Sequence, residues 1–86
     1  MEFMDKVIGR IQLLLGNTYY IRYDYNTFEE CFIVRALRND CNIQINIKFY
    51  KPDLEDIEFN ILASFTAQKI ISEFSEIYDK RENEEE

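Results

Sequence analysis

The chain has 86 residues, and its 17 acidic side chains outnumber 10 basic ones to give a formal charge of −7. At this length we expect one domain around one core, without a cleft between domains. The chain contains no His, which removes the commonest general base and metal ligand, and its acidic balance argues against a protein that works by neutralising phosphates.

The N-terminal segment predicts an amphipathic helix. Between Phe3 and Leu15 the apolar residues recur at helical spacing on one face, which indicates a helix over residues 2–15. Gly16 then supplies a natural end to this helix, because glycine enters the left-handed region without strain.

The middle of the chain predicts three antiparallel strands. Residues 18–25 and 41–50 alternate apolar and polar side chains, and residues 28–38 are rich in types that suit a pleated surface. Asn26-Thr27 and Asn39-Asp40 are predicted as two-residue turns between them, since Asn and Asp tolerate positive φ.

These turns also predict a register. With two residues in each turn, Tyr25 faces Phe28, Ile47 faces Phe32, and the apolar residues of both hairpins share one face of the middle strand. A one-residue slip in either hairpin would destroy that agreement. Glu30 is the exception, a carboxylate expected on the core face, at the rim of the sheet or turned outward by a bulge.

The segment after Pro52 can be a helix or a strand. Asp53 and the acids that follow it can cap a helix, whereas residues 57–61 alternate apolar and polar side chains. One helix over residues 53–80 would have to break its apolar stripe, so we predict a fourth strand at 56–62 and a final helix from about residue 64 or 66 to 81.

The predicted fold class is α+β, a single domain with element order αββββα. A three- to four-stranded antiparallel meander would carry the N-terminal and C-terminal helices on one face. The domain is expected over residues 1–81, and residues 82–86 are expected to be an acidic disordered tail.

The two cysteines are the only candidates for redox or metal chemistry. In the predicted register Cys31 and Cys41 lie about 20 Å apart, at ~3.4 Å per residue, which excludes a disulfide within the chain. Without His or a CxxC motif, a zinc site is not expected. Cys31 is expected on the outer face between Arg22 and Lys48. Such cations lower a thiol pKa and permit a reactive thiol, but a plain strand residue is the favoured interpretation.

No reaction is indicated, so we expect no enzyme, cofactor or metal. The serines lack a base beside them, and two glycines cannot form a phosphate loop. The outer sheet face carries aromatic and cationic residues, but a chain at −7 would repel a nucleic-acid backbone. No apolar run approaches the roughly 20 residues of a membrane span, and the first residues lack a signal-peptide core, so a cytoplasmic protein is expected.

The charge excess indicates a basic protein partner. Residues 51–86 contain four basic and eleven acidic side chains, whereas residues 1–50 are neutral. Clustered carboxylates can occupy phosphate sites on a basic surface and speed association by steering. The candidate partner-binding residues are Asp53, Glu55, Asp56 and Glu58, with Asp24, Glu29 and Tyr50 near the same end of the predicted sheet.

In size, charge, composition and helix–meander–helix order, the chain resembles the small acidic inhibitors that phages and mobile elements encode, of which anti-CRISPR proteins are one group. The resemblance covers the whole chain in outline and involves no motif. It implies a protein that binds a nucleic-acid-binding effector in the host cytosol, such as a CRISPR nuclease, and blocks it by occupying its basic surface.

Two alternatives stay open. An immunity protein or antitoxin that neutralises a cognate toxin would bind through the same attraction between carboxylates and a basic surface. A structural or assembly protein would instead associate through its outer sheet face or a sheet edge, burying residues such as Ile33, Leu37 and Tyr50. The sequence leaves the oligomeric state undecided.

Overall fold

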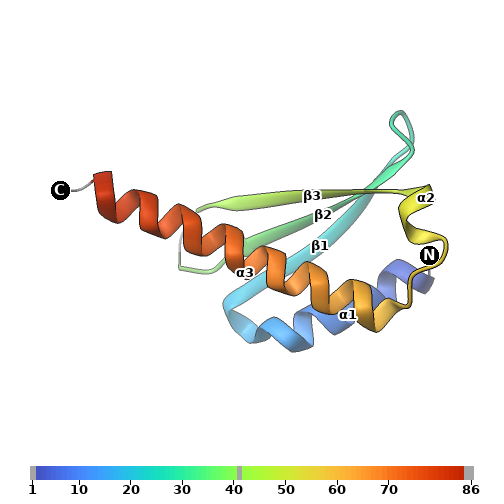
Figure 1. Ribbon diagram of the computed structural model, residues 1–86, viewed down its shortest axis with the longest axis horizontal. Coiled ribbons are helices and arrows are strands. Elements are labelled where there is room, and N and C mark those ends of the chain that lie inside the picture. The colour runs from blue at the N-terminus through green and yellow to red at the C-terminus, as the bar shows by residue number, and fades with distance from the viewer. Residues whose placement is uncertain (1, 41, 85–86) are drawn as a thin grey trace.

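The chain folds into a helix layer on one face of an antiparallel sheet (Figure 1). The structure is a computed structural model, and it describes residues 2–40 and 42–84, with the side chains of 81–84 excepted. Its elements follow in the order α1, a 3-10 turn at Gly16–Thr18, β1, β2, β3, α2 and α3. The predicted α+β class, with a helix at each end of the chain, is therefore confirmed.

Helix α1 spans Glu2–Leu15, as predicted. Its buried face is Met4, Val7 and Ile11, which lie three and four residues apart and so share one side of the helix. Gly16 follows with a φ of 73°, the left-handed conformation expected of a glycine that ends a helix.

The sheet has three strands in the order β1-β2-β3. Strand β1 spans Tyr19–Asn26, β2 spans Cys31–Arg38 and β3 spans Gln44–Tyr50. Alternate residues of each strand are buried or half-buried on the core face, and the fully buried ones are Ile21, Phe32, Val34, Ala36, Ile45 and Ile47. The predicted alternation thus assigned the core face correctly.

The predicted register was wrong in both hairpins. Tyr25 faces Phe32 rather than Phe28, because the first turn has four residues, 27–30, instead of two. Ile47 faces Val34 rather than Phe32 across the second hairpin. The first shift is four residues and the second is two. Because side chains alternate with a period of two, an even shift leaves every residue that stays in a strand on its predicted face. Phe28 and Glu30, both predicted on the core face, instead lie exposed in the turn.

The predicted fourth strand is absent from the described part of the chain. A short helix, α2, spans Lys51–Leu54 with Pro52 in its first turn, and one long helix, α3, spans Phe59–Glu84. The helix keeps a continuous buried stripe because the small residues Ala63, Thr66 and Ala67 fill the positions between Leu62, Ile70 and Phe74. Thr66 is accommodated because its Oγ1 donates to the Leu62 carbonyl at 2.7 Å.

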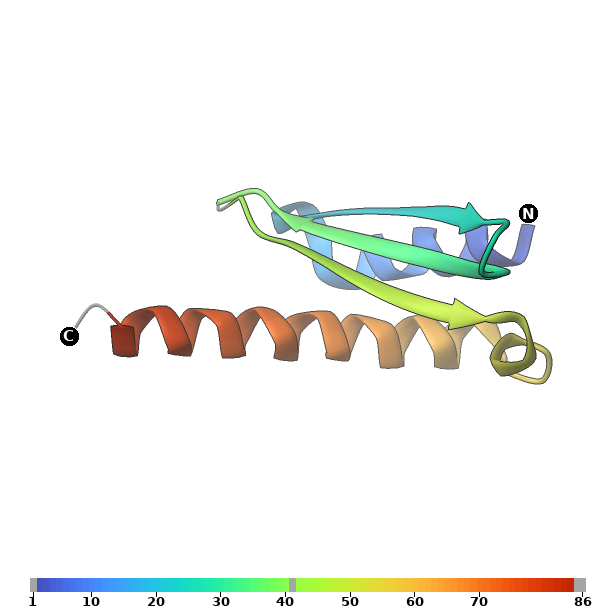
Figure 2. The same ribbon diagram turned by 90° about the horizontal axis from the view of Figure 1, so that it is seen from above.

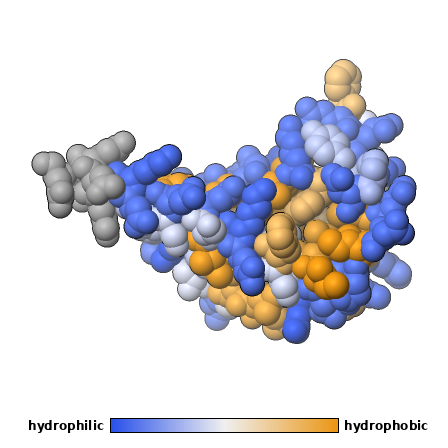
Figure 3. Space-filling model, in the orientation of Figure 1, coloured by the Kyte–Doolittle hydropathy of each residue, from blue (hydrophilic) through white to orange (hydrophobic). Residues whose placement is uncertain are grey.

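Large apolar residues on α3 misdirected that prediction. Ile61 and Phe65, which continue an apolar row from Ile57 at helical spacing, are 61% and 68% exposed. Figure 3 shows apolar side chains gathered on the outside of the helix layer. Large apolar side chains therefore lie on both faces of this helix, so their positions alone do not identify its packed face.

The helices cover different parts of the sheet. Seen from above, α1 lies behind β1 and β2, while α3 runs along the β3 side (Figure 2). Tyr19 of β1 meets Phe74 of α3 edge to face, with ring centroids 5.4 Å apart. Helix α3 continues past the end of the sheet (Figure 1) to Glu84, so it includes residues 82–84 of the expected tail, while residues 85 and 86 lie outside the described residues.

Exchanging one aromatic ring on each face of α3 tests this packing. Phe74→Ala empties a fully buried site and should lower the free energy of unfolding by about 3–5 kcal/mol. Phe65→Ala removes an exposed ring and should change it by about 0.5 kcal/mol or less. Urea denaturation followed by circular dichroism measures both. Equal losses would contradict the assignment of faces.

Candidate partner-binding site

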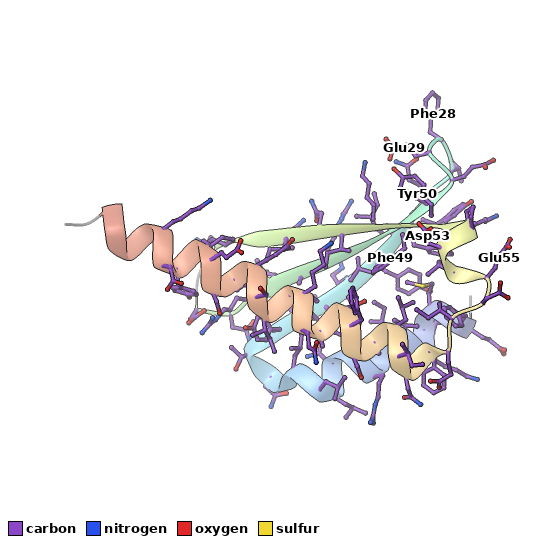
Figure 4. All side chains as sticks on the ribbon, in the orientation of Figure 1. Phe28, Glu29, Phe49, Tyr50, Asp53 and Glu55 are labelled. Carbon is purple, nitrogen blue, oxygen red and sulfur yellow. The ribbon has the colours of Figure 1, made fainter. Side chains whose placement is uncertain are left out.

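The β1–β2 turn is held by one side chain. Asn26 Oδ1 accepts the backbone N–H groups of Phe28 at 2.9 Å and Glu29 at 3.0 Å, and Glu30 completes the turn with a φ of 53°. Asn side chains favour turns because they bond the backbone two and three residues on. As a result Phe28 stands at the tip of the hairpin, where it is 97% exposed and points away from the protein (Figure 4).

Glu29 folds back from the turn onto the outer face of the sheet. Its Oε2 accepts from Lys48 Nζ at 2.9 Å, and this hydrogen bond and charge hold the pKa of Glu29 below its ordinary value. The pair therefore stabilises the turn at pH values above the ordinary carboxyl range. That contribution is lost as the pH falls through the lowered pKa of Glu29.

The same turn covers Cys31. This thiol is fully buried at the first position of β2, and its Sγ donates to Glu29 Oε2 at 3.7 Å. Burial raises the pKa of Cys31, and the nearby Glu29 carboxylate raises it further. Neighbouring cations were expected to lower the pKa of this thiol, but burial and Glu29 outweigh the effect of Lys48. The structure therefore favours a plain strand residue over a reactive thiol. Cys41 lies outside the described residues.

Most of the predicted site residues gather at the hairpin end of the molecule. Tyr50 ends β3, Asp53 lies in α2, and Glu55 and Asp56 follow α2 directly. Figure 4 shows Glu29, Tyr50, Asp53 and Glu55 at the same end as Phe28. We call this surface, formed by the turn 27–30, Tyr50 and residues 53–56, the hairpin end.

Two predicted acids are engaged within the chain. Asp24 lies on the outer sheet face, where its Oδ2 is 3.0 Å from Arg35 Nη1. Glu58 precedes α3: its carbonyl accepts the Leu62 N–H at 3.1 Å and its Oε1 accepts from Asn60 Nδ2 at 3.0 Å. These contacts give Asp24 and Glu58 structural roles, which weakens their case as partner-binding residues.

The remaining acids carry uncompensated charge. Within the described residues, Asp53, Glu55 and Asp56 are exposed and make no ion pair with a Lys or Arg side chain. Because Glu29 is balanced by Lys48, the negative potential of the hairpin end comes chiefly from residues 53–56 and the exposed Glu30.

An apolar hollow of about 280 Å³ opens beside these acids. It lies between the start of α1, β2 and α2, and its lining is Phe3, Met4, Phe32, Lys51, Leu54 and Glu55. Lys51 also places its Nζ 5.4 Å from the centre of the Tyr25 ring. The hollow can receive an apolar side chain, with one cation and one anion at its wall.

Sequence reasoning missed Phe28 and the hollow. Phe28 was assigned to the core because a two-residue turn puts it opposite Tyr25. The one sequence signal for the longer turn was Asn26, whose side chain can accept the N–H groups two and three residues further on. Asn at this position also suits a two-residue turn, so the signal did not decide between them. The hollow depends on α2, a short helix at Lys51–Leu54 that precedes the predicted fourth strand and was not itself predicted.

The described residues provide little for other chemistry. Across residues 2–40 and 42–84, no three His, Cys, Asp or Glu side chains gather in a way that could hold a metal ion. None of the described helices is both long and apolar enough to cross a membrane. Comparison with protein-family models, curated proteins and solved structures finds no match. The function is therefore argued from the surface itself.

The Glu29 contact with Cys31 predicts a titration. Glu29→Gln removes the neighbouring charge, so the pKa of Cys31 should fall towards its ordinary value. The ¹³Cβ shift of labelled Cys31, followed against pH in a Cys41→Ser background, measures this directly. Glu30→Gln removes the same charge one residue away and serves as the control. An unchanged midpoint in Glu29→Gln would contradict the contact.

Proposed function

We propose that this protein is a stoichiometric inhibitor that binds a nucleic-acid-binding effector, such as a CRISPR nuclease, through its hairpin end. The observation that supports this most strongly is Phe28, an aromatic ring left 97% exposed by a turn whose backbone is tied down by Asn26. Burying that ring is the largest gain that any single exposed side chain of this end can offer a partner.

The acids beside Phe28 support the choice of partner. Asp53, Glu55 and Asp56 project uncompensated negative charge from the same end, which attracts a surface rich in Lys and Arg. Surfaces that bind nucleic acid are of this kind, because they neutralise phosphates. In the proposed complex the acids take the place of phosphates and steer the approach, while Phe28 enters an apolar site and slows dissociation.

An immunity protein or antitoxin is the second candidate function. A toxin nuclease also presents a basic surface, so the same acids and the same ring would serve. The two functions differ in which enzyme is inhibited, and a panel containing both kinds of nuclease distinguishes them.

Charge reversal at the hairpin end tests the proposal. Binding to purified guide-RNA nucleases and toxin nucleases is measured by calorimetry at several salt concentrations. Asp53→Lys, Glu55→Lys and Asp56→Lys together should weaken binding by about tenfold or more and flatten its salt dependence. Phe28→Ser should weaken it by roughly 30-fold, as expected of an aromatic anchor, with the salt dependence kept.

A matched control separates local from net charge. Glu73, Glu76 and Asp79 lie in the C-terminal half of α3, away from the hairpin end, and reversing all three to Lys changes the net charge by the same amount. This variant should bind nearly as the natural protein does. If the control loses affinity while the hairpin-end variants keep it, the proposed site is wrong.

A further inference from the structure

The two edge strands of the sheet differ in whether their outer backbone groups are hydrogen-bonded. With the order β1-β2-β3, β1 and β3 each have one side without a neighbouring strand. On such a side every second residue points its N–H and C=O outward, and these groups can pair with another chain unless something covers them.

The β1 edge is closed by α1. Gln12 Nε2 donates to the Tyr19 carbonyl at 2.7 Å, and Gln12 Oε1 accepts the Ile21 N–H at 3.2 Å. One side-chain amide thus makes the two bonds that a peptide group of a neighbouring strand would make. Tyr23 further along β1 is also tied to α1, because its hydroxyl donates to Asp5 Oδ1 at 2.6 Å.

The β3 edge has no equivalent cover. Of the backbone hydrogen bonds that residues 2–40 and 42–84 make outside helices and strand pairs, none involves β3, and no side chain among them bonds its backbone. Helix α3 runs beside β3 in Figure 2, and no strand pairs with the outer side of β3. Its seven residues contain no Pro and one charge, Lys48, so the usual devices that protect an edge are nearly absent.

We propose that this edge pairs with β3 of a second copy, antiparallel about a two-fold axis through Ile47, to form a continuous sheet of twice three strands. Such an axis stands perpendicular to the sheet, so the helix layers of both copies stay on the same side. Ile47 then meets Ile47 of the second copy, and Ile45 meets Phe49, which continues the apolar face.

The polar face of β3 is also self-complementary in this register. Lys48 lies opposite Asn46 of the second copy, and Gln44 lies opposite Tyr50. No like charges face one another, whereas an axis through Lys48 would oppose two ammonium groups. The match on both faces is what selects a second copy of this chain as the occupant, rather than an unrelated strand.

The salt dependence of the dimer distinguishes this pairing from the proposed binding to a basic partner. Two copies that each carry −7 repel one another, so added salt should strengthen the dimer. Binding of the acidic hairpin end to a basic partner should weaken with salt instead. Either proposal can therefore fail while the other holds.

Sedimentation velocity across a concentration series tests the pairing, with two variants of one exposed residue. Asn46→Lys places a cation opposite Lys48 of the second copy, and the two-fold axis makes this contact twice, so the dimer should weaken about three- to tenfold. Asn46→Glu places an anion there and should strengthen it by a similar factor. Circular dichroism confirms that both variants remain folded.

Three results would overturn the proposal. The first is a protein that stays monomeric at every concentration and salt level. The second is a dimer that responds equally to Asn46→Lys and Asn46→Glu, which would place the contact elsewhere or on another register. The third is an edge that binds a scrambled peptide of residues 43–51 as tightly as the natural peptide, which would assign it to extended peptides in general rather than to a second copy.

Discussion

The hydrogen bonds of the Asn26 side chain hold the turn on which the whole hairpin end depends. By accepting the N–H groups of Phe28 and Glu29, Asn26 makes the chain turn over four residues. That length sets the pairing of Tyr25 with Phe32, whose rings lie 4.9 Å apart. It also leaves Phe28 outside, brings Glu29 to Lys48 and covers Cys31. The proposed anchor, its ion pair and the buried thiol all follow from one turn.

Sequence patterning predicted the faces of this fold better than its pairings. In strands such as Gln44–Tyr50, apolar and polar side chains alternate with a period of two, and this alternation identifies the buried face. A pairing register shifted by an even number of residues gives the same alternation, so the pattern cannot detect such a shift. The shift came from the turns, where Asn26 permits both a two-residue and a four-residue loop. For α3 the packed face includes the small residues Ala63 and Ala67, whereas the large side chains of Ile61 and Phe65 are exposed. A stripe traced through the large apolar residues therefore breaks.

The site was predicted in part for the same reason. Asp53, Glu55 and Asp56 are visible as a charge cluster, and they are exposed as expected. Nothing in the sequence shows that Asp24 is balanced by Arg35 or that Glu58 serves the start of α3, since both facts depend on tertiary neighbours. Phe28 shows the limit most clearly, because its core or surface position depends on two residues of turn length.

Cross-strand contacts at the first hairpin test the account most directly. With the Phe and Tyr rings assigned by NMR, nuclear Overhauser effects should join Tyr25 to Phe32 and leave Phe28 without contacts to the core. The amide protons of Phe28 and Glu29 should exchange faster with solvent in Asn26→Ala than in the natural protein. A Tyr25–Phe28 contact would mean a two-residue turn and a buried Phe28, and it would contradict both the fold of this end and the function proposed for it.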